Sequence, residues 1–154
     1  MTVETKAIEK VITIAARPET VFRLLIDPNE YVRWKGKLAQ FDARPGGTFH
    51  VDFMNDKDVV DGKFVEVIPS RRVVFTWGWK DSPLVPPGSS TVEIDLEPDG
   101  HGTRLRLVHR GLPEEALAPH TEGWDYFLPR LTNVAEGREP VSDPAHHTAA
   151  KTQE

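Results

Sequence analysis

The sequence predicts an α+β domain in which a curved antiparallel sheet is covered by one long C-terminal helix. Alternating apolar and polar residues, separated by turn residues, dominate the stretch from about residue 36 to residue 110 and indicate about six strands. Helical spacing of apolar residues occurs before this stretch and again after it. A sheet of this kind has one face to bury, and the final helix is the obvious cover.

The first forty residues predict one strand followed by two short helices. The β-branched run over residues 8–15 indicates the strand. Pro18 is a favourable first residue for a helix whose apolar positions run to Leu25. The Asp27–Pro28 pair ends this helix, and the Asp27 side chain is placed to cap a second one that runs through Tyr31 and Trp34.

The sheet region contains hairpins whose register can be predicted. Residues 49–53 alternate as a strand, and residues 64–68 and 72–79 indicate a hairpin. In the last hairpin, pairing Glu97 with Arg104 sets acids against arginines on one face, whereas a slip of one residue sets acids against leucines. The opposite, core-facing side then holds Leu96 with Leu105, Ile94 with Leu107, and Val92 with His109.

The chain ends in a predicted helix and a polar tail. The helix begins near Pro113 or restarts near Pro119, and Gly137 is its expected stop. Pro129 falls inside it and predicts a kink. Its apolar stripe is formed by Trp124, Phe127, Leu128, Leu131 and Val134. We therefore expect a single domain over residues 1–137 and a weakly held polar tail over residues 138–154.

Composition excludes several classes of protein. The 154 residues include no cysteine, which rules out a disulfide scaffold, a cysteine-ligated metal and a cysteine nucleophile. The net charge of −5 argues against nucleic acid or an anionic membrane as a partner. The N-terminal residues carry no secretory signal, and no apolar run is long enough to span a membrane. A cytoplasmic location is the resulting expectation.

Several segments, in order along residues 8–136, resemble one known superfamily. They are residues 42–47, residues 62–77, residues 102–105, residues 109–112 and residues 120–124. Together they resemble the START-like, or SRPBCC, superfamily, in the branch homologous to the heat-shock-protein-90 ATPase activator. The resemblance implies a helix-grip fold, in which a sheet of six to seven strands wraps around the C-terminal helix and encloses a cavity.

Aromatic residues on the inner face are the leading candidates for a ligand site. Tryptophan offers a large apolar surface together with an indole donor, which suits a flat or apolar ligand, although each such ring also suits a packed core. The predicted cavity residues are Trp34, Phe49, Phe53, Phe75, Trp77, Trp79, His109, Trp124, Phe127 and Leu128.

Catalytic chemistry has weaker support in the sequence. His109 is the one candidate base on the inner face, and a structural hydrogen bond is the more common role for such a histidine. His120 is expected to shape the start of the final helix, and Gly123 to let that helix approach the sheet. His146–His147 lacks a third ligand, so no metal, cofactor or catalytic residue is predicted.

Three functions follow as hypotheses. The favoured one is a non-enzymatic domain that binds an apolar or aromatic small molecule in the cavity. The resemblance also implies two alternatives, an enzyme of the polyketide cyclase or aromatase type and a chaperone-interacting protein of the heat-shock ATPase activator type. A homodimer is left open.

Overall fold

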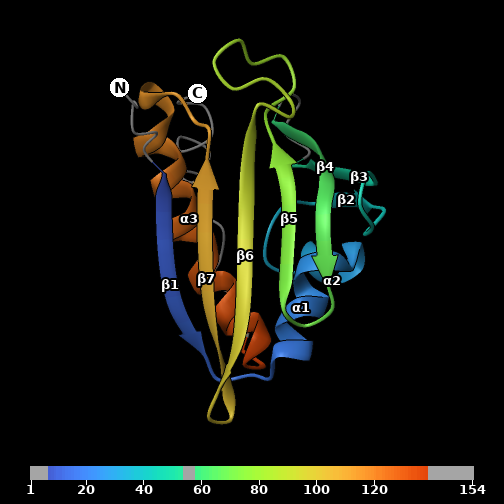
Figure 1. Cartoon of the computed structure of the whole chain (residues 1–154), viewed down its shortest axis with the longest axis vertical. Helices are drawn as coiled ribbons and strands as arrows, with labels where there is room; N and C mark the ends of the chain where they lie inside the picture. Colours follow the sequence, from blue (N-terminus) through green and yellow to red (C-terminus); the bar gives the residue numbers. More distant parts are fainter. Residues whose placement is uncertain (1–6, 54–57, 139–154) are drawn as a thin grey trace.

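The computed structural model describes residues 7–53 and 58–138 and shows one seven-stranded antiparallel sheet (Figure 1). The strands are β1 (Ile8–Ile14), β2 (Leu38–Phe41), β3 (Thr48–Asp52), β4 (Val59–Ile68), β5 (Arg72–Trp77), β6 (Ser90–Asp99) and β7 (Gly102–Arg110). Their order across the sheet is β1-β7-β6-β5-β4-β3-β2. The predicted tail over residues 138–154 lies outside the described residues, apart from Arg138.

Three helices lie in the described part of the chain: α1 (Pro18–Ile26), α2 (Pro28–Tyr31) and α3 (Glu114–Ala135). In Figure 1, α3 crosses behind the sheet from the side of β1 and β7, while α1 and α2 lie behind β4 and β5. This is the curved sheet with a long covering helix and two short helices after the first strand that the sequence predicted. No helix in the described part of the chain is both long and apolar enough to span a membrane.

The N-terminal helices begin and end where the sequence indicates. Pro18 is the first residue of α1, where the missing N–H costs no helical hydrogen bond. Asp27 caps α2, because its carboxylate accepts hydrogen bonds from the backbone N–H groups of Asn29 at 2.9 Å and Glu30 at 3.4 Å. The helix itself is shorter than predicted and ends at Tyr31.

The β6–β7 register is confirmed pair for pair. Glu97 pairs with Arg104, Leu96 with Leu105, and Val92 with His109. On the outer face Arg104 Nη1 lies 3.6 Å from Glu97 Oε1, as the register predicts, whereas Asp95 and Arg106 have other partners. Arg72 Nη1 lies 2.9 Å from Asp95 Oδ1, and Arg106 pairs instead with Glu9 on β1. The alternation sets the register because a shift of one residue would turn the leucines to solvent.

Helix α3 continues through both of its prolines. A proline lacks the N–H that would bond the carbonyl four residues earlier, so Pro119 and Pro129 leave the carbonyls of Glu115 and Asp125 without that partner. Both of these residues are exposed, so water is available to those carbonyls. Gly137 follows the helix with a φ of 84°, the left-handed conformation that commonly ends a helix.

The turn before β3 depends on glycine at positions 46 and 47. A Cβ on Gly47 would clash with the backbone carbonyl of Asp42, while Gly46 adopts a φ of 85°. The assignment for Gly123 is wrong, because a Cβ there would meet nothing within 4 Å. Gly123 therefore leaves open space beside α3 rather than allowing close contact with the sheet.

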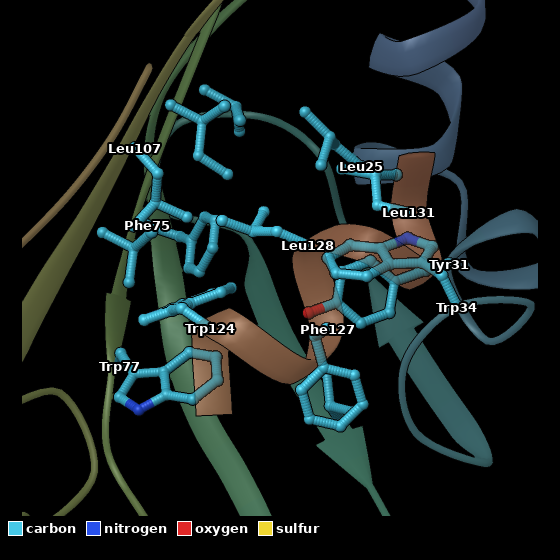
Figure 2. Packing of buried hydrophobic residues seen from close by; sticks show 14 of the residues in the cluster. Leu25, Tyr31, Trp34, Phe75, Trp77, Leu107, Trp124, Phe127, Leu128 and Leu131 are labelled. Atoms are coloured by element: carbon cyan, nitrogen blue, oxygen red, sulfur yellow. The ribbon is translucent and has the colours of Figure 1, made fainter. Parts of the chain in front are cut away.

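The core lies between the concave face of the sheet and the three helices. Figure 2 shows its interior, with Trp77, Trp124 and Phe127 near one end and Leu25, Tyr31 and Leu131 near the other. Phe49 stacks on Phe75, with ring centroids 4.1 Å apart. This interlocked packing fixes the aromatic walls of the candidate site.

Candidate functional site

A small cavity lies between β5 and the first half of α3. It has a volume of about 20 Å³, enough for roughly one water molecule, and it is partly open to solvent. Eight residues line it: Lys35, Trp77, Trp79, Pro119, His120, Gly123, Trp124 and Phe127. Gly123 is partly exposed, whereas the other seven are buried, so the opening lies on the Gly123 side.

Four of the predicted cavity residues line this space, namely Trp77, Trp79, Trp124 and Phe127. They meet because alternation along β5 and just beyond it points Trp77 and Trp79 inward, and the i, i+3 spacing of α3 presents Trp124 and Phe127 to them. The rings of Trp77 and Trp124 are 5.5 Å apart, and those of Trp77 and Trp79 are 5.6 Å apart.

The other six predicted residues are buried but do not line the cavity. Phe49 and Phe75 pack as a stack deeper in the core. The indole N–H of Trp34 donates to the Leu24 carbonyl at 2.8 Å, which ties the segment after α2 to α1. His109 lies behind the aromatic wall. The remaining two, Phe53 and Leu128, belong to the same hydrophobic core.

His109 is fully buried and is held in one tautomer. An indole N–H only donates, so the 3.1 Å bond from Trp124 Nε1 makes His109 Nδ1 an acceptor. The proton is therefore on Nε2, which donates to Ser90 Oγ at 2.9 Å. Ser90 in turn donates to the Trp77 carbonyl at 2.9 Å. Burial, with smaller contributions from His120 and Lys35, lowers the pKa of His109 well below its usual value.

His120 lies inside α3, not before it, which corrects the expectation that it shapes the helix start. Its Nδ1–H donates to the Ala116 carbonyl at 2.8 Å, and its Nε2 accepts from Trp79 Nε1 at 2.9 Å. Burial lowers the pKa of His120 to about 4. Both histidines are therefore neutral near pH 7, and all four of their ring nitrogens are engaged in hydrogen bonds.

Lys35 is a functional candidate that the sequence reasoning missed. Its side chain is buried, with only 4% of the residue exposed. Its Nζ lies 4.0 Å from the ring centroid of Trp124, 4.1 Å from that of Trp77 and 5.0 Å from that of Phe127. These distances are those of cation–π contacts. Burial lowers the pKa of Lys35 well below its usual value.

The backbone around Lys35 is fixed from both sides. Its N–H donates to the Tyr31 carbonyl at 3.0 Å, which continues the turn of α2, and Gly36 then reverses the chain with a φ of 79°. Arg130 of α3 donates from Nε to the Trp34 carbonyl at 3.0 Å. These contacts hold the segment against α3, so the Lys35 side chain is directed into the aromatic wall.

Two buried polar groups in the described part of the chain have no hydrogen-bond partner. They are the indole N–H of Trp77 and the hydroxyl of Tyr31. In Figure 2 the Tyr31 hydroxyl points inward, on the side of α3. Burial raises the pKa of this hydroxyl, which therefore stays protonated. Unpartnered buried polar groups are rare in proteins, and both of these lie in the aromatic interior.

The sequence contains a signal for one of the two site residues that were not predicted, Ser90, but none for the other, Lys35. Ser90 could have been found, because it lies two residues before Val92 on the core-facing side of β6. Lys35 had no such signal, since a lysine between a short helix and a glycine is ordinarily exposed. Among the described residues, no group of three or more potential ligands is arranged to hold a metal ion.

The fold and this aromatic interior define a helix-grip domain of the START-like class. Residues 15–136 match the family described as Activator of Hsp90 ATPase homolog 1-like protein, and the chain belongs to this family. The human Activator of 90 kDa heat shock protein ATPase homolog 1 is 24% identical over 115 residues, which are 75% of this chain and 32% of the human protein. This chain therefore spans about a third of that relative's length.

Two solved structures support the same assignment of fold. The AHSA1-like protein from Rhizobium etli is 45% identical, with a TM-score of 0.74 over 92% of this chain and 89% of that one. The Aha1 dimer from Colwellia psychrerythraea is 22% identical, with a TM-score of 0.75 over 86% of this chain and 97% of that one. The second likeness shows the fold alone, and the dimer is a property of the Colwellia protein.

Proposed function

We propose that this protein is a small-molecule-binding domain whose ligand, flat and largely apolar, enters between β5 and α3. The observation that carries the proposal is the cavity walled by Trp77, Trp79, Trp124 and Phe127 and open beside Gly123. Ligand sites are concave and mostly aromatic or aliphatic, with a few polar groups that fix orientation. The composition without cysteine supports a cytoplasmic location as part of this proposal.

Binding requires the cavity to enlarge, because about 20 Å³ holds no more than a water molecule while ligand pockets span ~300–1,000 Å³. Lys35 is the one long flexible side chain among the lining residues. Withdrawal of Lys35 from the three rings would open space without moving the backbone of the sheet or of α3. A flat ligand would then contact the tryptophan faces that Lys35 now covers.

The experiment is a titration with 2-naphthol, followed by intrinsic tryptophan fluorescence and calorimetry. The variant Gly123→Leu places a branched side chain at the opening, where a Cβ meets nothing within 4 Å. Glu122→Leu adds the same side chain to the exposed face of the same helix turn and serves as the control. We expect saturable binding that Gly123→Leu weakens at least tenfold and Glu122→Leu leaves within twofold. Absence of saturable binding to the unmodified protein contradicts the proposal.

The enzyme alternative gains nothing from the site. His109, the one base considered for it, is not among the residues that line the cavity, and both of its ring nitrogens are occupied by Trp124 and Ser90. A reacting group would need one of those nitrogens free.

A chaperone-interacting role is a second candidate, which rests on membership of the Hsp90-ATPase-activator-like family. Its test is the ATPase rate of Hsp90 with and without this protein. Stimulation at micromolar concentration supports this candidate, and an unchanged rate across that range contradicts it.

A further inference from the structure

The polar groups at the cavity are unbalanced in favour of donors. The indole N–H groups of Trp79 and Trp124 are satisfied by the two histidines. The Trp77 N–H is buried without an acceptor, and the Lys35 side-chain nitrogen is in no ion pair or hydrogen bond within the described part of the chain. The histidine acceptor nitrogens are already used. The two unpartnered side-chain groups at this wall in the described part of the chain, the Trp77 N–H and the Lys35 ammonium, are both donors.

The charge at the cavity is equally one-sided. None of the eight lining residues is acidic, and Lys35 is the one lining group that carries a charge when protonated, since the pKa of His120 is about 4. A buried ammonium without a counter-ion is unfavourable, because it has lost its hydration, and only an anion or strong acceptors replace that loss in full. The three rings around Nζ recover part of that cost through cation–π contacts.

We infer that the ligand is an aromatic carboxylate, an inference that rests on the proposed function. Its ring lies against the tryptophans and its carboxylate pairs with Lys35 Nζ. A carboxylate supplies the acceptor oxygens and the negative charge that the site lacks. The walls of Trp77, Trp124 and Phe127 supply the apolar surface for its ring system. Lys35 then acts as the residue that determines specificity.

A cationic ligand fits the same rings less well. The ring faces of Trp77 and Trp124 already accommodate the ammonium of Lys35 at 4.1 and 4.0 Å. A second cation would either displace that ammonium into a buried place without a partner or lie against it, and like charges at this separation repel. The observations therefore favour an anion.

The inference is tested with three probes that share one ring system and differ in charge. They are 2-naphthoate, 2-naphthamide and 2-naphthyltrimethylammonium, each titrated calorimetrically into the unmodified protein at pH 7. We expect 2-naphthoate to bind about tenfold or more tightly than 2-naphthamide, as a charge-assisted hydrogen bond implies. The cation should bind more weakly than either.

Lys35→Met removes the charge and keeps a long apolar side chain, and Lys37→Met is the matched control because Lys37 is exposed two residues away. The preference for naphthoate over naphthamide should vanish in Lys35→Met and persist in Lys37→Met. Raising the pH should weaken the binding of 2-naphthoate but not that of the other two probes, because the ion pair needs a protonated Lys35. Tighter binding of the amide or the cation, or a preference that survives Lys35→Met, overturns the inference and leaves the proposed function standing. If 2-naphthol binds and none of the three probes does, the inference alone is overturned, whereas the proposed function fails when 2-naphthol does not bind either.

Discussion

The indole N–H of Trp79 donates to Nε2 of His120 over 2.9 Å and so determines where the imidazole carries its proton. An indole cannot accept, so a protonated Nε2 would place two N–H groups head to head. Trp124 restrains His109 through Nδ1 in the same manner. Each tryptophan thereby keeps one buried histidine neutral, and the two imidazoles adopt opposite tautomers.

This arrangement predicts an acid-sensitive fold. The pKa of His120 is lowered to about 4 and that of His109 well below 6.5, so below pH 6.5 the unfolded chain binds protons that the folded chain does not. Stability is then complete above pH 6.5 and decreases as the pH falls toward the folded-state values, by about 1.4 kcal/mol per pH unit for each histidine. Urea unfolding at pH 7.5, 6.0 and 5.0 measures this slope.

The control for this experiment is His101→Gln, because His101 is exposed and outside the core. It should leave the pH slope unchanged, whereas His120→Gln should reduce it. An unfolding free energy that is flat between pH 7.5 and pH 5.0 in the unmodified protein would show that neither imidazole is held neutral.

Lys35→Met should stabilise the protein by roughly 1–3 kcal/mol at pH 7, because a flexible apolar side chain replaces a buried amine. Since the folded-state pKa of Lys35 lies below 10.5, the unmodified protein loses stability as the pH falls from 10.5 toward that value. The gain in Lys35→Met should therefore be larger at pH 6 than at pH 10. Thermal unfolding of both proteins across this range measures the difference, and a Lys35→Met variant that is less stable at every pH refutes the prediction.

Two glycine substitutions should have opposite effects. Gly123→Ala should stabilise the protein by roughly 0.5–1 kcal/mol, because the position is helical and an added Cβ meets nothing within 4 Å. Gly47→Ala should destabilise it by roughly 1–3 kcal/mol, because the added Cβ would clash with the Asp42 carbonyl. The melting temperatures of the two variants show whether each substitution stabilises or destabilises the protein. A lower melting temperature for Gly123→Ala would mean that the space beside α3 is filled.

The order of the elements and the β6–β7 register could be predicted from sequence because alternation, turn residues and caps are local signals. The pairing of Glu97 with Arg104 is one example. The size of the cavity could not, because it depends on how side chains from α3, β5 and the segment after α2 fill a common space. The spacing of the aromatic residues assigns them to the interior. It does not indicate which of them line the cavity.

Lys35 and Arg72 show the same limit for charged residues. Arg72 on β5 donates to Glu66 on β4 and Asp95 on β6, at 2.8 and 2.9 Å on the outer face. Lys35 enters the core because Gly36 reverses the chain and Arg130 ties the preceding carbonyl to α3. Gly36 is adjacent to Lys35 in sequence, whereas Arg130 is 95 positions away. A local sequence pattern can therefore indicate the restraint from Gly36 but not the one from Arg130.

The order of the strands also constrains how the chain assembles on the ribosome. Strands β2 to β7 each pair with a neighbour in sequence, so these hairpins close short loops as they emerge. Among the described strands, β1 pairs with β7 alone, and Ile8 lies opposite His109 about a hundred residues later. A nascent chain that stops before residue 102 therefore exposes the first strand without its partner. Synthesis of β7 then pairs one edge of β1, while the opposite edge of β1 remains the end of the described sheet.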